Sequence, residues 1–562
     1  MGMGRNSRAP RRRTVQGTRP RWPIALAALA VGASAHAQSD FPPEPRSPRP
    51  QGSGLSAPGS QGESGPLVPG SAVGASGAPG LRAPVSTFFG IRTDVIYTDN
   101  ATFAPKGQEK DEVRLEVAPY MSVFANTQKT QGTLFYSPRF ILRTLEGASN
   151  AVRHDLAATG NHYLYDDNVG LRATANVFDT NESPFGTTSV DPSVNPSNRT
   201  RYSAFSLSPY ARGRLAGTVD AEARYRIDYI DQGGNFESEI VNRVSGAMGS
   251  LSGTSRLGWR VAGTAAQSEY EQGFKYDRTF VTGLGYYVFN ASERIGLGVN
   301  CASNSILRDS EGRDSGCGPA VSGEWRPTPR TTVNGFFADA YYGWTGFARV
   351  LHLVDRWAFG LNGRKGVFDR GDSGTQFLDP LLGVAGEGSL SSANKALLDV
   401  IETRNRGIVP GQRSSLSFGG IQSAIVDERA VNATLGYAFG RTAYGATLFY
   451  IEQSTNTLNI VDNLSPLPGA LTDLTQRGVD LNGSYRVDVR GSIVGGYRFS
   501  KSTSDSAATS SRLDTYYAGY RAELSRRLSA GLVYRFSSQR ANGAAAVDYD
   551  ENAVIATLDF RL

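Results

Sequence analysis

The sequence has 562 residues, of which 20% are charged and 10% aromatic, and it contains 65 Gly but only two Cys. Two Cys in a chain of this length exclude a scaffold held together by many disulfides. The formal net charge is +6, but seven arginines and no acidic residue precede residue 38, so the rest of the chain carries 6 − 7 = −1. A nearly neutral chain gives no basis for nucleic-acid binding.

The N-terminus has the pattern of an export signal. An arginine-rich start leads into the apolar run WPIALAALAVGA at residues 22–33, and Ala35-His36-Ala37 is the small-x-small pattern that signal peptidase cleaves. The run is too short to cross a bilayer as a helix, which disfavours the alternative of an N-terminal anchor. We therefore predict a signal peptide at residues 1–37, cleaved between Ala37 and Gln38, with translation starting at Met1 or at a later residue such as Met3.

Residues 38–85 are predicted to be a disordered linker. Among these 48 residues are 10 Pro, 9 Gly and 8 Ser. Such a segment cannot bury enough apolar surface to offset the entropy lost on ordering, so we expect a mobile tether. It also cannot form the folded plug that precedes the barrel of a TonB-dependent transporter.

From residue 86 the hydrophobic pattern changes to a period of two. In residues 219–230 every odd position is apolar, whereas the even positions up to residue 228 are charged. Strict alternation over this length indicates a β-strand with one apolar and one charged face. Similar alternation recurs at residues 169–177, 479–487, 528–537 and 554–562.

The spacing of these segments predicts a transmembrane barrel. We expect 22 strands (20 to 24 fit the pattern), most of them longer than the strands of about five or six residues that soluble proteins average. The connections after even strands are very short and most of those after odd strands are long, as in outer-membrane barrels with short periplasmic turns. The fold class is therefore predicted to be all-β: an outer-membrane antiparallel β-barrel over residues 86–562, located in the bacterial (Gram-negative) outer membrane.

The alternation also predicts which side chains face the lumen. Polar and charged positions opposite the apolar face are the candidates: Arg172, Asp220, Glu222, Arg224, Arg226, Asp228, Asp480, Arg486 and Arg535. The last strand ends with Phe560 and Leu562 on its lipid-facing side, and we expect the barrel assembly machinery to recognise this end. Closing the barrel requires this strand to pair with residues 86–98, because an open edge is not tolerated in lipid.

A series of motifs in residues 95–185 carries a family resemblance. They are VIYTDNATFAP at 95–105, VRLEVAPYMSVF at 113–124, LFYS at 134–137, HDL at 154–156 and DTNESPF at 179–185. This order resembles the outer-membrane β-barrel family associated with PEP-CTERM/exosortase systems, which accompany exopolysaccharide gene clusters. The resemblance implies an outer-membrane barrel and polysaccharide export components as partners. It implies no activity, because the family has no established one.

No catalytic, cofactor-binding or metal site is predicted. His154 and His162 are eight residues apart on one expected strand, about 26 Å at about 3.3 Å per residue, which is too far to share a metal. No serine, histidine and orienting group form a local constellation, so we expect no enzyme. Cys301 and Cys317 bracket most of the outer loop expected at residues 306–318, between the strands expected at 293–305 and 319–326, and an oxidising periplasm favours a disulfide between them over two free thiols.

Two functions remain open from the sequence. The barrel is either a conduit, passive or gated, for a polar solute or polysaccharide, or a non-conducting structural or assembly component of the outer membrane. A 22-stranded barrel is wide enough to hold a lumen. The long connection at residues 370–421 contains apolar segments and is expected either to fold inward as a constriction or to pack outside on its neighbours.

Overall fold

The computed structural model describes the part of the chain that forms the barrel, between Val85 and Leu562. Outside the description lie residues 1–84, 370–424 and shorter stretches, at 166–167, 182, 184, 189–197, 216–217, 232, 234–237, 251–255, 272–274, 291–292, 329, 355, 456–458, 461–472 and 544–546. The predicted signal peptide with its cleavage site Ala37/Gln38, the linker up to residue 84 and the long connection at 370–421 therefore fall outside the described residues. Within the described part, no helix has the length and apolar character needed to cross a membrane.

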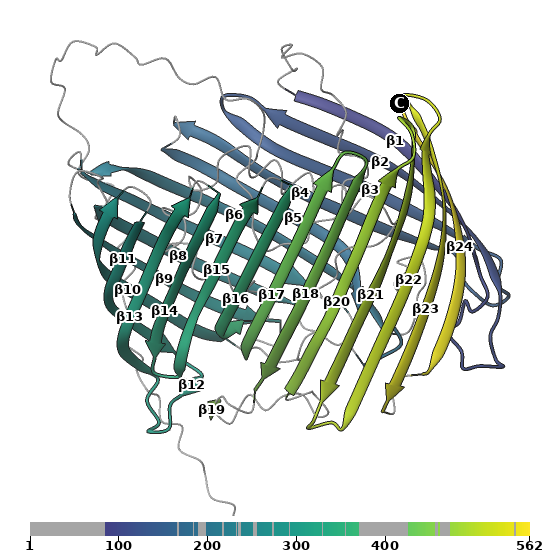
Figure 1. The fold of residues 1–562 in the computed structure, drawn as a ribbon. Helices are drawn as coiled ribbons and strands as arrows, with labels where there is room; N and C mark the ends of the chain where they lie inside the picture. The colour runs from purple at the N-terminus through teal and green to yellow at the C-terminus, as the bar shows by residue number, and fades with distance from the viewer. Residues whose placement is uncertain are drawn as a thin grey trace, which may run out of the picture. The chain divides into compact units, whose positions relative to one another are not determined.

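Twenty-two strands form one antiparallel sheet (Figure 1). In the first half they are β1 (Val85–Thr98), β2 (Glu112–Asn126), β3 (Thr130–Arg143), β4 (Ala151–Tyr165), β5 (Val169–Asn181), β6 (Arg199–Leu215), β7 (Val219–Asp231), β8 (Glu239–Ser250), β9 (Leu257–Tyr270), β10 (Lys275–Asn290) and β11 (Glu293–Asn304). The second half comprises β13 (Ser315–Thr328), β14 (Thr331–Ala340), β15 (Gly343–Val354), β16 (Trp357–Asp369), β17 (Ile425–Phe439), β18 (Thr442–Ser454), β20 (Asp473–Arg486), β21 (Gly491–Ser504), β22 (Thr509–Glu523), β23 (Leu528–Asn542) and β24 (Tyr549–Arg561).

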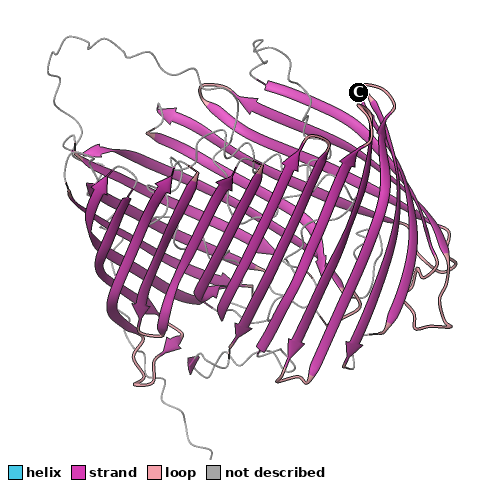
Figure 2. Ribbon diagram, in the orientation of Figure 1, coloured by secondary structure: helices cyan, strands magenta, loops and turns pink. Residues whose placement is uncertain are grey.

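The sheet closes on itself through its first and last strands (Figure 2). β1 pairs with β24 from Gly90 opposite Arg561 to Thr98 opposite Ala553. The backbone N–H of Leu562 donates to the carbonyl of Phe89 at 3.0 Å and extends this seam by one bond. The predicted closure of the barrel, the number of 22 strands and the all-β fold class are confirmed.

The connections at the two ends of the barrel differ in length. At the end that holds Val85 and the C-terminus they comprise two to six residues, for example residues 127–129 and 487–490. At the other end they range from two residues to the 55 residues of 370–424. We call these ends the short-turn end and the long-loop end; in outer-membrane barrels the short turns are periplasmic.

The structure departs from the expected strands at one corner of the barrel. The sequence suggested a strand at residues 319–326 after a loop at 306–318, whereas β13 already begins at Ser315. Within the shortened loop, β12 (Leu307–Arg308) pairs with β19 (Asn459–Ile460), which lies in the connection between β18 and β20. Alternating glycines at positions 316 and 318 hid the start of β13, because glycine is depleted in strands.

Side chains alternate between the outside and the inside of the wall. In β24, Leu558 and Phe560 are exposed on the outer face, whereas Ile555 and Asp559 are buried on the inner face. The outer face of the other strands is likewise rich in exposed large apolar residues. A band of apolar side chains around a closed sheet is the surface that hydrocarbon requires.

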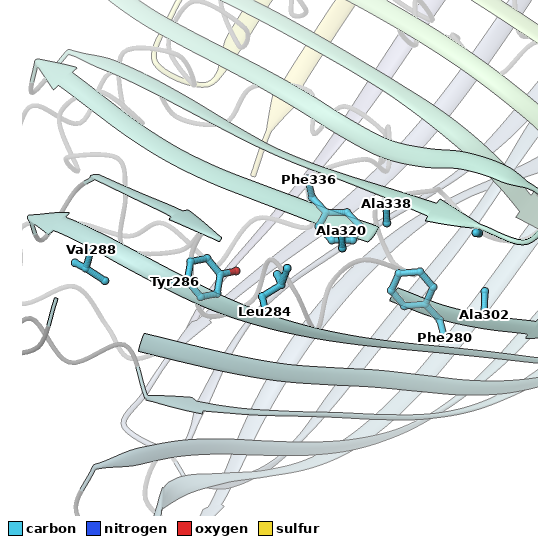
Figure 3. Packing of buried hydrophobic residues seen from close by; sticks show 9 residues of the cluster. Phe280, Leu284, Tyr286, Val288, Ala302, Ala320, Phe336 and Ala338 are labelled. Atoms are coloured by element: carbon cyan, nitrogen blue, oxygen red, sulfur yellow. The ribbon is translucent and has the colours of Figure 1, made fainter. Parts of the chain in front are cut away.

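The inner wall is not polar throughout. Across β10, β11, β13 and β14 it carries a cluster of buried apolar residues, shown in Figure 3: Phe280, Leu284, Tyr286, Val288, Ala302, Ala320, Phe336, Ala338 and Ala340. The rings of Phe280 and Phe336 meet edge to face with centroids 6.4 Å apart, although two strands separate β10 from β14. Small inner residues on the two strands between them, Ala302 and Ala320, let the wall bend sharply enough for this contact. The inner face of these four strands is therefore apolar at these positions, unlike the charged face predicted for residues 219–230.

Candidate functional site

The predicted lumen residues lie on the inner-facing positions of four strands. Arg172 is on β5, Asp480 and Arg486 are on β20, and Arg535 is on β23. The remaining five candidates occupy alternate positions of β7: Asp220, Glu222, Arg224, Arg226 and Asp228. Asp228 and Arg535 are deeply buried, whereas Asp220 and Arg486 are exposed at the short-turn end. Along these strands the candidates alternate with the exposed apolar side chains of the outer face, such as Tyr225 and Leu481.

Most of these charges are in ion pairs along the inner wall. On β7, Arg224 Nη2 lies 2.8 Å from Glu222 Oε1, and Arg226 Nε lies 2.6 Å from Asp228 Oδ1. Arg535 Nη2 lies 3.0 Å from Glu551 Oε1 on β24, and both side chains are almost completely buried. Removing one partner of such a buried pair leaves an uncompensated charge, which costs about 3–5 kcal/mol.

Charged pairs also involve residues that the sequence did not single out, such as Arg498, Arg143 and Glu112. Asp480 is paired with Arg498 of β21, and Arg143 Nε of β3 lies 2.7 Å from Glu112 Oε1 of β2. Asp480 lies directly opposite Arg498, whereas Arg143 lies opposite Arg114 and reaches Glu112 diagonally, so both contacts depend on the strand register. Sequence alternation identifies a charged face but not which charges on it become neighbours.

Two adjoining hollows open in the inner wall near the short-turn end. The first, of about 120 Å³, is lined by residues of β3 to β7: Gln131, Gly132, Thr159, Gly160, Asn161, Tyr163, Arg172, Tyr210, Arg212, Glu222 and Arg224. The second, of about 450 Å³, extends from the turn before β5 to β9 and shares Arg212 and Glu222 with the first. Both hollows are therefore rich in arginine.

At the long-loop end, the connection between β5 and β6 reaches across the lumen. Phe185 forms a buried apolar cluster with Val426 of β17 and Leu474 of β20, on the opposite side of the barrel by strand order. The same connection contacts the closing strands, since the backbone N–H of Thr188 donates to Gln539 Oε1 at 2.9 Å and the hydroxyl of Tyr549 donates to the carbonyl of Thr188 at 2.6 Å. We call residues 185–188 the crossing segment.

A second structure at the long-loop end forms from the paired strands β12 and β19. Leu307 of β12 is buried in a cluster with Tyr270, Tyr276 and Ile306. Tyr341 and Tyr342, in the connection between β14 and β15, pack against this cluster, and burial raises the pKa of Tyr342 to about 12, so its hydroxyl stays neutral. The crossing segment and the β12–β19 pair both lie at the long-loop end.

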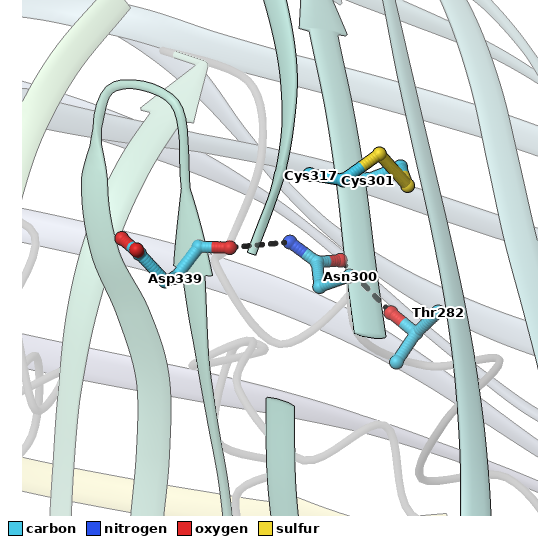
Figure 4. The surroundings of a disulfide bond; sticks show 5 residues. All are labelled: Thr282, Asn300, Cys301, Cys317 and Asp339. Atoms are coloured by element: carbon cyan, nitrogen blue, oxygen red, sulfur yellow. Dashed lines mark hydrogen bonds between the residues drawn. A yellow bond between two sulfur atoms is a disulfide. The ribbon is translucent and has the colours of Figure 1, made fainter. Parts of the chain in front are cut away.

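The two cysteines are joined by a disulfide with an S–S distance of 2.07 Å (Figure 4). Cys301 of β11 lies directly opposite Cys317 of β13, so the bond links two paired strands and closes the connection between them. On the inner side of the same corner, Thr282 Oγ1 donates to Asn300 Oδ1 at 3.0 Å, and Asn300 Nδ2 donates to the carbonyl of Asp339 at 3.3 Å. The disulfide therefore lies on the outer face of the sharply bent wall.

The histidines that follow the predicted signal peptide do not gather into a site. His154 and His162 of β4 share a face and contact Tyr136 and Thr130 respectively, while His352 of β15 contacts Thr331. Across the described residues, no group of three or more His, Cys, Asp or Glu side chains is arranged to hold a metal ion.

Several solved structures of outer-membrane proteins are similar to this chain. OpdK of Pseudomonas aeruginosa with vanillate has a TM-score of 0.33 and 8% identity, covering 85% of this chain and 99% of its own. The siderophore receptor PirA of Acinetobacter baumannii has a TM-score of 0.43 and 8% identity, covering 85% and 80%. PirA of Pseudomonas aeruginosa has a TM-score of 0.35 and 9% identity, covering 86% and 81%. No protein-family model matches the sequence, and neither does any curated protein.

The geometry itself defines the class of protein. Twenty-two antiparallel strands, most of them of 12 to 17 residues, form a closed sheet, and a tilted strand needs about 9–11 residues to cross a bilayer. The outer face is apolar and most of the inner face is polar. In a closed barrel every strand has two hydrogen-bonded neighbours, so no backbone edge is exposed to lipid, as a membrane-spanning sheet requires. The protein is an outer-membrane β-barrel.

Proposed function

We propose that the protein is a conduit for polar solutes whose long-loop end is narrowed by its own inward-folded connections. The observation that carries this proposal is the crossing segment, which is anchored to the far wall through Phe185 and to β23 and β24 through Thr188. Below it, the inner wall is hollowed and charged near the short turns. A polar, hollow half beneath a narrowed half suits a channel that admits solutes selectively.

A tethered pair of cysteines tests this proposal. In a chain with Cys301→Ser and Cys317→Ser, the changes Phe185→Cys and Val426→Cys place two thiols at the contact between the crossing segment and β17. In planar bilayers the oxidised protein should show a small conductance, and reduction should raise it as the segment is released. A control with Phe185→Cys alone should not respond to reductant.

A non-conducting structural role is the alternative. It is favoured by the buried ion pairs that occupy inner positions, such as Arg535 with Glu551. Absence of conductance in the reduced and the oxidised protein would support it and refute the conduit. We propose that neither role is enzymatic, and that no cofactor takes part.

We further propose that the conduit belongs to a PEP-CTERM/exosortase type of exopolysaccharide export system. Support comes from the resemblance of residues 90–186 to barrels of those systems. Deleting the gene should lower the secreted polysaccharide without lowering its synthesis inside the cell. Within this proposal, residues 1–37 direct export, the linker at 38–85 tethers periplasmic partners, and the barrel assembly machinery recognises Phe560 and Leu562, which face lipid at the end of the closing strand.

A further inference from the structure

The two hollows at the short-turn end concentrate positive charge. Three arginines and one glutamate line the first, a net charge of 3 − 1 = +2: Arg172, Arg212, Arg224 and Glu222. The second adds Arg214, Arg260 and Asp220, so the two together carry 5 − 2 = +3. The chain that follows the predicted signal peptide has a net charge of 6 − 7 = −1, so this excess is local to the wall formed by β5, β6, β7 and β9.

One arginine of the first hollow is held in place by its surroundings. Arg224 donates to Glu222 Oε1 at 2.8 Å, and its guanidinium lies over the ring of Tyr210 at 5.6 Å from the centroid. Tyr210 in turn lies over Gly170, where an added Cβ would come within 2.5 Å of the tyrosine oxygen. A guanidinium that is already oriented loses less entropy when it binds an anion.

The polar neighbours of these arginines suit a hydroxylated ligand. Gln131, Thr159, Asn161 and Tyr163 line the same hollow, and the hydroxyl of Tyr163 donates to Gln131 Oε1 at 3.3 Å. Amides and hydroxyls both donate and accept hydrogen bonds, as sugar hydroxyls do. Guanidinium groups pair with carboxylates through two parallel hydrogen bonds. The lining thus offers cationic donors beside neutral hydrogen-bonding groups.

We propose that this inner wall binds carboxylate-bearing carbohydrate, with Arg172, Arg212 and Arg224 receiving the carboxylate and the neighbouring amides and hydroxyls receiving the sugar hydroxyls. The inference names the substrate class of the conduit and in that respect rests on the proposed function. The site lies at the end of the barrel that carries the short turns, so it is the first inner surface that a solute from that side meets.

Binding can be measured without conduction. The full-length chain in detergent would be titrated with trigalacturonic acid and with the neutral trisaccharide maltotriose by calorimetry at low salt. We expect the acidic sugar to bind and the neutral one not to bind measurably. Arg172→Gln with Arg212→Gln should lower the affinity for the acidic sugar by about ten-fold or more, because two charge-assisted hydrogen-bonding groups are lost. Glu222→Gln should raise this affinity, because it removes a negative charge that repels the carboxylate of the sugar.

A matched control lies on the far side of the barrel. Arg364→Gln removes one positive charge from an inner position of β16, where the guanidinium is paired with Glu428, and should leave the affinity unchanged. Equal affinity for both sugars, or an affinity unaffected by the double arginine change, would overturn the inference. If the protein binds the acidic sugar selectively and the arginine changes weaken this binding, but no conductance is measured in planar bilayers, the binding site is supported and the conduit is refuted.

Discussion

Phe185, just after β5, packs against Val426, the second residue of β17, from the opposite side of the barrel. The contact includes Leu474 and is the apolar anchor of a connection that is otherwise held by hydrogen bonds to the closing strands. Burying one Phe side chain contributes about 1.5–3 kcal/mol. An anchor of this size keeps the crossing segment in place most of the time and still permits its release.

Shortening this anchor should open the conduit. Phe185→Ala removes most of the apolar contact, so the crossing segment should leave the far wall more often and the mean single-channel conductance in planar bilayers should rise. The matched control is Phe178→Ala, on β5 itself, whose ring packs against Tyr202 of the adjacent strand rather than across the lumen. An equal rise in both variants would show that the effect comes from a loosened wall and not from the crossing segment.

The register of β7 predicts opposite outcomes for neighbouring residues. Ala223, the fifth residue of β7, faces outward, so Ala223→Arg should cost about 2–4 kcal/mol if this position lies near the bilayer midplane, because a charge enters hydrocarbon. Arg224→Ser on the inner face should leave folding nearly intact. Urea titration of protein folded into lipid vesicles measures both changes. If Arg224 were the intolerant position, the assignment of faces would be wrong by one residue.

Loss of the closing strand should prevent assembly. Deleting residues 539–562 removes all of β24 and leaves β1 and β23 as open edges, which lipid does not tolerate. The truncated chain should reach the periplasm and be degraded there, as cell fractionation and immunoblotting would reveal. Normal levels of the truncated protein in the outer membrane would contradict closure by this strand.

Adding a side chain at the bent corner should lower the stability of the protein at one glycine of β13 and leave it nearly unchanged at another. At Gly318 an added Cβ would lie 2.7 Å from Asp339 Cβ and 2.7 Å from the carbonyl oxygen of Asp339. Gly318→Val should therefore lower the free energy of unfolding by about 1–3 kcal/mol. At Gly323 of the same strand nothing lies within 4 Å of an added Cβ, so Gly323→Ala should be close to neutral. The midpoint of urea unfolding compares the two, and equal midpoints would refute close packing at the corner.

Acid should loosen the outer connection between β11 and β13. Asp309 is partly desolvated, which raises its pKa, but Arg313 and the backbone N–H groups of Glu311 and Arg313 donate to it and hold its pKa below the ordinary value of 3.8. A carboxylate with a lowered pKa contributes stability above its unfolded value and loses it as pH falls through the folded one. Hydrogen exchange of residues 309–313 should therefore accelerate below about pH 4. Asp309→Asn should exchange rapidly already at neutral pH.

Strand positions and faces were predictable because they depend on local pattern. Alternation in β7 and β24 identifies an apolar face that must meet lipid, and the difference in connection length identifies the two ends. The apolar corner was not predictable in this way. On β10 both faces are apolar, with Phe280 inward and Val281 outward, so alternation is lost.

The inward-folded connections were not predictable either. Thr188 meets Gln539 across 351 positions of sequence, and β12 and β19 comprise two residues each. Such contacts depend on the closed wall that brings distant connections together. A short segment with no period of its own gives no signal of which partner it will meet. The arginine-lined hollows were unpredictable for the same reason, because they combine residues that only the strand register brings together.

The seam between β1 and β24 has a mechanical consequence. β24 ends opposite Gly90 and Leu562 bonds to Phe89, so Val85 to Phe88 are paired on one side only, with β2. The seam joins nine pairs of residues, whereas β1 and β2 share 14. Under lateral stress, such as membrane thinning beside the protein, separation of the wall should start at this seam and travel from the short-turn end.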